Sequence, residues 1–314
     1  MLLSEIRRDD KFEGFLIVRS AEKRAAASGK NYLDMTLADR SGSINAKMWD
    51  GTVQPPVAGS IVKVRATGNE FNGRMQLRVE KIRAAEKKDD VDMASLIPCA
   101  PEDPKKMLEE IVRAADHIAD DDLRRITCAL LDRAGDKLLT FPAAKQMHHA
   151  ERSGLLHHMT TMLRAAKAIM TVYPRLNASL LTAGVIVHDL AKIDEMDADA
   201  LGLVADYSVD GKLLGHIVRG VVNIQTAAEK TGASPAKALL LQHMVLSHHG
   251  IPDYGSPIAP KFPEAEVLNT LDTLDARLYE MDEAIARAVP GGFSEKVWGL
   301  DNRQLYRIPE EDLT

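Results

Sequence analysis

The 314-residue sequence predicts a multidomain α and β protein, in which a small five-stranded β-barrel precedes an all-α helical bundle. Three observations support this fold class. Residues 11 to about 85 alternate between apolar and polar side chains in short runs, as half-buried strands do. Residues 86–104 are first charged and then rich in proline, which is typical of a linker. From residue 105 onward, apolar residues recur at intervals of three and four, as in amphipathic helices.

The expected strands follow one another without a long helix between them. The clearest alternation spans residues 31–39. Leu33, Met35 and Leu37 share one face of this strand, and the other face carries Tyr32, Asp34, Thr36 and Ala38. The remaining strands are expected at residues 12–18, 44–49, 61–66 and 75–79, with turns at residues 40–43 and at Asn72–Gly73. Five strands in about 75 residues fit a small barrel.

The helical region divides into long segments. Helices are expected at residues 105–119, 122–135 and 153–172, and Pro174 ends the last of them. The whole chain is therefore divided into residues 1–85 as the barrel, 86–104 as the linker, 105–290 as the helical domain, and 291–314 as a C-terminal extension expected to pack on that domain.

Composition excludes several classes of protein. Hydrophobic residues make up 45% of the chain, enough for a core, and the net charge of -6 argues against a general basic coat for nucleic acid. Two cysteines provide no disulfide framework and no CxxC zinc motif. Neither a signal peptide nor an apolar run of membrane-spanning length is found, so a cytoplasmic protein without a membrane partner is expected.

Nine of the ten histidines fall between His148 and His249, interleaved with carboxylates. Neutral imidazole and carboxylate hold Mn, Fe, Co, Ni or Zn at neutral pH. The ordered series is long enough for two ions, and a two-metal site is suited to attack on phosphate esters. Its members are His158, His188, Asp189, His216, His248, His249 and Asp272.

Local patterns indicate that parts of this series are buried. His158 shares the apolar face of its helix with Met162, Ala165 and Ile169, whereas His157 points about a quarter turn away and is not expected to be a ligand. The pair His188-Asp189 ends the apolar run 180–187, where polar groups are costly to bury unless they are paired or bind a metal.

The barrel region resembles the OB-fold nucleic-acid-binding modules of the tRNA-anticodon type. The resemblance rests on residues 31–39 followed by Gly42-Ser43-Ile44-Asn45-Ala46-Lys47-Met48-Trp49. OB folds stack bases on aromatic rings and bind phosphates with basic side chains. The candidates for these contacts are Tyr32, Lys47, Phe71, Arg74, Arg78 and Trp49. Tyr32 and Trp49 are equally compatible with positions in the barrel core.

The helical region resembles the HD-domain phosphohydrolases at His188-Asp189-x-x-Lys192. It is similar in particular to the YhaM-like 3′→5′ exoribonucleases, in which an OB-like module precedes the HD domain. The segments that carry this likeness are 147–158, 213–217, 243–250, 254–257 and 300–306. The resemblance therefore extends over nearly the whole chain.

The resemblance implies a role for each candidate residue. One metal is expected on His158, His188, Asp189 and Asp272, and a second on His216, His248 and His249, with Asp189 as the bridge and Asp275 as the rival of Asp272. Asp189 and Lys192 are the catalytic candidates. Lys192, His148 and His149 are expected to contact substrate phosphate. The alternatives are a solvated helix end for Lys192 and capping of the next helix for the two histidines.

The implied activity is metal-dependent 3′→5′ hydrolysis of single-stranded RNA to nucleoside monophosphates. The family implies Mn²⁺, and the number of ligands implies two ions, while Fe, Co or Ni also fit the ligands. DNA as substrate and a homo-oligomeric state stay open. The first alternative is a nucleotide or cyclic-nucleotide phosphohydrolase, which would need no strand-binding barrel. The second is a nucleic-acid-binding protein without catalysis, against which the complete ligand series argues.

Overall fold

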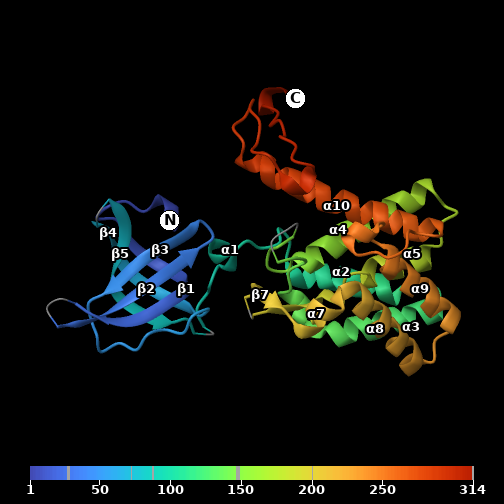
Figure 1. The fold of residues 1–314 in the computed structure, drawn as a ribbon, viewed down its shortest axis with the longest axis horizontal. Helices are drawn as coiled ribbons and strands as arrows, with labels where there is room; N and C mark the ends of the chain where they lie inside the picture. The colour runs from blue at the N-terminus through green and yellow to red at the C-terminus, as the bar shows by residue number, and fades with distance from the viewer. Residues whose placement is uncertain (27–28, 72, 87, 146–148, 200, 313–314) are drawn as a thin grey trace. The chain divides into compact units, whose positions relative to one another are not determined.

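The computed structural model describes residues 1–26, 29–71, 73–86, 88–145, 149–199 and 201–312. The chain forms two compact units, Met1–Cys99 and Ala100–Thr314 (Figure 1). Each unit has its own cluster of buried apolar side chains. The units are therefore described separately.

The first unit is a closed five-stranded barrel. Its strands are β1 (Lys11–Ala25), β2 (Asn31–Asp39), β3 (Gly42–Met48), β4 (Ile61–Phe71) and β5 (Arg74–Ala84), in the order β1-β2-β3-β5-β4. All neighbours are antiparallel except β3 and β5, which are parallel. The long strand β1 closes the barrel because its first half pairs with β4 and its second half pairs with β2. This topology confirms the predicted OB-like barrel.

Strand β2 follows the predicted alternation, with one exception. Leu33, Met35 and Leu37 are buried in the core, as expected. Ala38, expected on the outer face, is also buried. Ala38 pairs in register with the buried Ile17 of β1. Helix α1 (Met93–Leu96) contacts both β1 and β2. The segment expected to be a linker therefore contributes a short helix that covers part of the outer barrel face.

The second unit is mainly helical. Its α-helices are α2 (Pro104–Asp116), α3 (Asp121–Ala134), α4 (Gly154–Val172), α5 (Ala178–Val187), α6 (Lys192–Glu195), α7 (Val209–Leu213), α8 (Gly215–Thr231), α9 (Pro235–Ser247) and α10 (Pro263–Arg287). Short 3₁₀ helices across the chain are η1 (Leu3–Glu5), η2 (Gly135–Leu139), η3 (Pro252–Tyr254), η4 (Trp298–Leu300) and η5 (Glu310–Asp312). Within the described part of the chain, no helix is long and apolar enough to cross a membrane.

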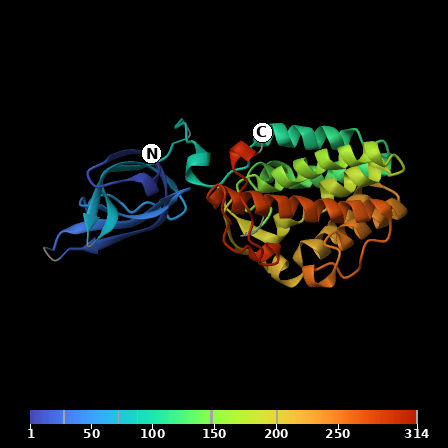
Figure 2. The same cartoon turned by 90° about the horizontal axis from the view of Figure 1, so that it is seen from above.

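Helix α5 is the centre of this unit. It is apolar on nearly all sides, and α2, α3, α4, α9 and α10 all contact it. Asn177 begins the helix, and its side-chain oxygen accepts a hydrogen bond from the backbone N–H of Leu180. Figures 1 and 2 show α4 and α10 running beside each other over this centre. Because α5 ends inside the bundle, the residues that follow it are held in a buried position.

The helical unit also contains a β-hairpin and a C-terminal segment that lies outside the helices. Strands β6 (Met196–Ala198) and β7 (Val204–Tyr207) form an antiparallel hairpin that the sequence patterns did not indicate. The segment after α10 folds back on that helix. Leu300 and Leu305 are buried there, and the Arg307 guanidinium donates to the backbone oxygens of Ala286 and Ala288.

Candidate metal centre and nucleic-acid surface

Five segments of the helical unit bring the seven predicted metal ligands together. His158 lies in the second turn of α4, His188 and Asp189 directly follow α5, and His216 lies at the start of α8. The remaining three are His248 and His249 after α9 and Asp272 on α10. His188, Asp189 and His248 are almost fully buried. The burial of this polar cluster has to be compensated by partners or by a bound cation.

Asp189 lies at the centre of the cluster, and its two carboxylate oxygens face different histidines. Oδ2 lies 3.6 Å from Nε2 of His158 and 3.4 Å from Nε2 of His188. Oδ1 lies 3.5 Å from Nε2 of His216 and 3.6 Å from Nε2 of His248. The carboxylate therefore divides the histidines into two sets, as a ligand that bridges two cations would.

His249 lies with the second set of histidines. Its ring centroid is 4.1 Å from that of His248 and 5.3 Å from that of His216. His216, His248 and His249 each have one ring nitrogen that lies within 4.8 Å of such a nitrogen in the other two residues. Burial and the neighbouring His248 lower the pKa of His249 to about 4, so its imidazole is neutral at neutral pH. Neutral imidazole is the form that binds metal.

Two carboxylates from α10 approach opposite nitrogens of His158. Asp272 Oδ1 lies 3.3 Å from Nε2, and Asp275 Oδ2 lies 2.6 Å from Nδ1. Burial lowers the pKa of His158, but the hydrogen bonds to the two carboxylates outweigh it and raise the pKa to about 9. Asp272 therefore lies on the side of the ring that faces Asp189, whereas Asp275 lies behind the ring.

All five histidines of the cluster have an oxygen acceptor beside Nδ1. These acceptors are Asp275 for His158 (2.6 Å), the Val185 carbonyl for His188 (2.9 Å), Glu195 for His216 (3.0 Å), the Val245 carbonyl for His248 (2.7 Å) and the Tyr254 carbonyl for His249 (2.5 Å). An Nδ1–H that donates to such an oxygen leaves the lone pair on Nε2. This arrangement is typical of histidines that bind a metal through Nε2.

Three buried atoms at the centre have no hydrogen-bond partner among the residues that the structure describes. They are Asp189 Oδ1, His216 Nε2 and His248 Nε2. Leaving a buried polar atom unsatisfied costs about 1–3 kcal/mol. A divalent cation would satisfy all three, and the nitrogen and oxygen donors fit Mn, Fe, Co, Ni or Zn. The residues present therefore fit a bound transition metal.

Lys192 is part of the buried cluster and does not lie at a solvated helix end. Its side chain is 10% exposed, and Nζ lies 2.7 Å from Asp189 Oδ2. Burial lowers the pKa of Lys192, but Asp189 raises it further, so the ammonium group is retained. Burial likewise raises the pKa of Asp189, and Lys192 and His188 lower it well below its usual range. The centre thus contains an ammonium group next to the Asp189 carboxylate.

Sequence patterns missed Glu195, which contacts one of the predicted ligands. Glu195 binds both the backbone N–H and Nδ1 of His216. The sequence pattern that could have identified Glu195 is its position three residues after Lys192, on the same short helix. His149 is only 2% exposed, and its Nε2 lies 2.8 Å from Asp275 Oδ2. His148 lies outside the described residues, as does Asn72 of the predicted turn.

The predicted nucleic-acid candidates gather on one surface of the barrel. The Tyr32 and Trp49 rings are 4.9 Å apart, and Lys47 Nζ lies 5.6 Å from the centroids of both Tyr32 and Phe71. Arg74 pairs in register with Phe71, and Arg78 pairs with Lys47. Trp49 and Phe71 are 59% and 58% exposed, so neither belongs to the barrel core. Exposed rings beside basic side chains suit base stacking and phosphate contact.

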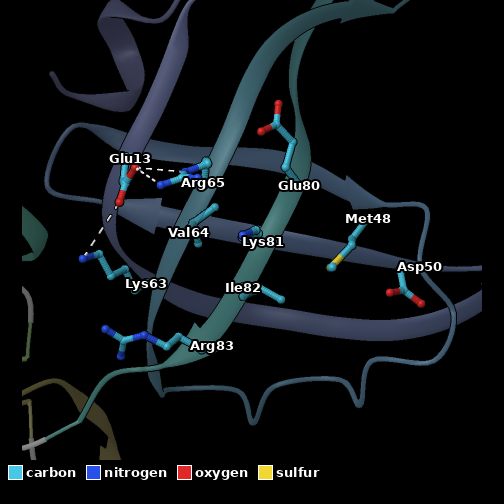
Figure 3. Close-up of a pocket in the computed structure, with 10 residues that line it drawn as sticks. All are labelled: Glu13, Met48, Asp50, Lys63, Val64, Arg65, Glu80, Lys81, Ile82 and Arg83. Carbon is cyan, nitrogen blue, oxygen red and sulfur yellow. Dashed lines mark hydrogen bonds and ion pairs between the residues drawn. The ribbon is translucent and has the colours of Figure 1, made fainter.

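A hollow of the barrel, about 520 Å³ in volume, shares none of these residues (Figure 3). Its charged side chains include Glu13, Lys63, Arg65 and Arg83. Glu13 lies 2.9 Å from Arg65, and Arg83 lies 2.7 Å from Asp89. The lining holds four basic and three acidic side chains, and these ion pairs neutralise two of the basic groups, so the hollow carries no strongly basic surface that would favour a polyanion.

The fold and the cluster define a protein with an OB-fold barrel and a helical unit that carries a buried histidine–aspartate centre. No protein-family model matches the chain. The chain is 39% identical over 301 residues to the 3′-5′ exoribonuclease YhaM of Geobacillus sp. (strain WCH70), covering 95% of this chain and 92% of that protein. It belongs to the YhaM exoribonuclease family.

Among solved structures, the second OB-fold domain of replication protein A from Methanococcus maripaludis is 18% identical to this chain, with a TM-score of 0.24. That match covers 29% of this chain and 98% of the archaeal domain. The OB domain of Ta0387 from Thermoplasma acidophilum is 12% identical, with a TM-score of 0.23, over 29% of this chain and 89% of that domain.

Proposed function

We propose that this protein is a metal-dependent 3′→5′ exoribonuclease that removes nucleoside monophosphates from the 3′ end of single-stranded RNA. Membership of the YhaM family supports the activity and its direction. The observation that carries the metal dependence is the set of five histidines whose Nδ1 meets an oxygen acceptor, four of which direct Nε2 toward Asp189. We assign catalysis to an HD domain at residues 105–290 and strand binding to residues 1–85.

The two sides of Asp189 define the proposed cation sites. His158, His188, Asp189 and Asp272 would hold one cation, and His216, His248, His249 and Asp189 the other. When bound, two divalent ions of this kind acidify a water molecule and polarise a phosphate ester. Mn²⁺ is the proposed native ion because the resemblance to the YhaM-like exoribonucleases implies it, and the imidazole and carboxylate donors are compatible with it.

Other residues of the centre take supporting roles in this proposal. The Lys192 ammonium group, held beside Asp189, is positioned to offset negative charge that develops on phosphate oxygens. Asp275 orients His158, which favours Asp272 as the ligand from α10. The burial of His149 favours support of Asp275 over the phosphate contact expected from the sequence.

The aromatic surface of the barrel would hold the RNA strand. Bases stack on the exposed rings of Trp49 and Phe71, and the phosphates lie near Lys47, Arg74 and Arg78. The local basic groups explain how a chain with a net charge of -6 can bind a polyanion. A strand-binding surface of this kind has no use in the hydrolysis of free nucleotides.

The test is incubation of the purified protein with Mn²⁺ and 5′-labelled single strands of RNA or DNA. We expect a ladder of shortened, still labelled RNA together with free nucleoside monophosphates. An intact strand whose mobility shifts on a gel would instead indicate binding alone. Hydrolysis of free nucleotides without a ladder would indicate a nucleotide phosphohydrolase.

Variants connect this activity to the centre. His188→Ala and Asp189→Ala should lose nearly all activity and nearly all Mn²⁺ bound at this centre, because each removes a proposed ligand from the buried cluster. His117→Ala is the matched control, since this exposed histidine lies at the end of α2, outside the cluster. Circular dichroism shows whether each variant is folded. Wild-type activity in either ligand variant would refute the assigned centre.

A further inference from the structure

A second cluster of possible metal ligands lies beside the proposed centre. It consists of His149 and Glu151, which precede α4, and His157 on the first turn of α4. We call these three residues the outer cluster. None of them belongs to the seven-residue ligand series, and His157 was not expected to bind a metal at all. All three side chains are largely buried, with exposures of 2%, 8% and 17%.

Three donor atoms of the outer cluster converge on one point. Nδ1 of His149 and Nδ1 of His157 lie 3.2 Å apart, and Oε1 of Glu151 lies 2.8 Å from the second nitrogen and 3.6 Å from the first. Ligands about 2.0–2.1 Å from a tetrahedral Zn²⁺ lie about 3.3 Å from one another. The three observed separations therefore bracket the spacing expected around a single ion.

Hydrogen bonds outside the outer cluster orient its donors. His149 Nε2 lies 2.8 Å from Asp275 Oδ2, so this nitrogen donates and the Nδ1 lone pair faces His157. The Tyr279 hydroxyl donates to the far oxygen of Glu151 at 3.2 Å. Outer partners of this kind are typical of metal ligands.

The backbone is also held in a costly conformation here. His149 and Ser153 have positive φ angles of 54° and 65°, which non-glycine residues seldom adopt. Such conformations persist where the surroundings fix them, and they occur often at functional sites. A cation bound to His149, Glu151 and His157 would fix this loop to the first turn of α4.

We propose that His149, Glu151 and His157 form a third cation site, selective for a divalent transition metal that accepts two imidazoles and one carboxylate. The donor set matches the two histidines and one glutamate of known zinc sites. Asp275 Oδ2 accepts from both His149 and His158, so one carboxylate oxygen connects the third site to a ligand of the main centre. The third site would thus position His158 through Asp275.

The test uses Zn²⁺ as the probe and the full-length protein with Asp189→Ala, which removes the carboxylate shared by both proposed main sites. After removal of metal with a chelator, Zn²⁺ is titrated calorimetrically and the bound metal is counted by elemental analysis. We expect one tightly bound Zn²⁺ per chain in this background. Adding His157→Ala or Glu151→Gln should abolish it, and adding Tyr279→Phe should weaken it by about tenfold, as the loss of an outer partner does.

The titrations distinguish a cation site at the outer cluster from a set of hydrogen bonds. Equal Zn²⁺ stoichiometry and affinity with and without Glu151→Gln would overturn the proposal and leave the outer cluster as hydrogen bonds only. Glu151→Gln retains the side-chain shape if His157→Ala does not fold, and His117→Ala controls for loss of an exposed histidine. Because the background lacks the shared ligand, the result does not depend on whether the main centre is catalytic. Failure of the proposed function would appear instead as absent RNA hydrolysis by the wild type.

Discussion

Replacement of Glu195 tests whether the outer hydrogen bonds of the main centre set its affinity for metal. Glu195 Oε1 lies 3.0 Å from both the backbone nitrogen and Nδ1 of His216. Burial raises the pKa of Glu195, but the hydrogen bond from His216 lowers it further, so the carboxylate is ionised at neutral pH. The ionised group accepts a hydrogen bond from Nδ1–H, and this keeps the lone pair on Nε2, which faces Asp189.

The expected loss of affinity depends on what replaces the carboxylate. Glu195→Gln retains an acceptor but loses the charge, and the difference between a charged and a neutral hydrogen bond is about 1 kcal/mol, or about fivefold in affinity. Glu195→Ala removes the acceptor, and loss of such an outer partner typically weakens metal binding by about 10–100-fold. The order should therefore be wild type, then Glu195→Gln, then Glu195→Ala.

The assay is Mn²⁺ titration of the metal-free protein against a competing chelator. Binding should weaken most for the cation proposed on the side of His216, because His216 is the predicted ligand that Glu195 contacts. Glu229→Ala, at an exposed position of α8, is the matched control. Unchanged affinity in Glu195→Ala would refute the reasoning. Equal weakening at both cation sites, with reduced unfolding stability, would show that Glu195 supports the fold instead.

Three further predictions concern other parts of the chain. Lys192→Ala should lower turnover much more than metal content, and parallel losses of both would make Lys192 a support for the ligands. Phe71→Ala should raise the KM for a 20-nucleotide RNA by about 5–150-fold, because stacking of one base contributes about 1–3 kcal/mol. The KM for a small diester should not change. An equal rise in the KM for RNA in Val57→Ala, which changes another exposed residue of the barrel, would contradict this prediction. The hydrogen bond from Arg164 lowers the pKa of Glu110 in the folded state. The pair therefore stabilises the fold fully at pH values above the pKa that Glu110 has in the unfolded chain. This stabilisation is lost as the pH falls through the lower pKa of the folded state. Arg164→Ala should therefore lower the Tm at neutral pH and have little effect in strong acid, and a pH-independent difference would count against the linkage.

Much of the fold and of the centre is evident in local patterns. Alternation along β2 identifies Leu33, Met35 and Leu37 as core residues because strand geometry turns successive side chains to opposite faces. Ala38 departs from this rule because α1, distant in sequence, covers the outer face at that point. Local alternation carries no information about such a covering element.

The same distinction holds within the helical unit. Asp272 and Asp275 are three residues apart and share one face of α10, so helical spacing alone cannot separate their roles. Their positions against the two nitrogens of His158 depend on how α4 and α10 pack. Glu195 and His149 likewise acquire their partners only through contacts between elements that are far apart in the chain.

The sequence by itself determined the two kinds of unit, the five strands of the barrel and a seven-residue series of candidate metal ligands, because periodicity and ligand chemistry are properties of the residues and their spacing. The tertiary structure decided which oxygen of Asp189 faces which histidine, which residues support the ligands, and that His149, Glu151 and His157 converge. These depend on the packing of α4, α5, α8, α9 and α10, which fixes ångström-scale separations that no spacing along the chain encodes.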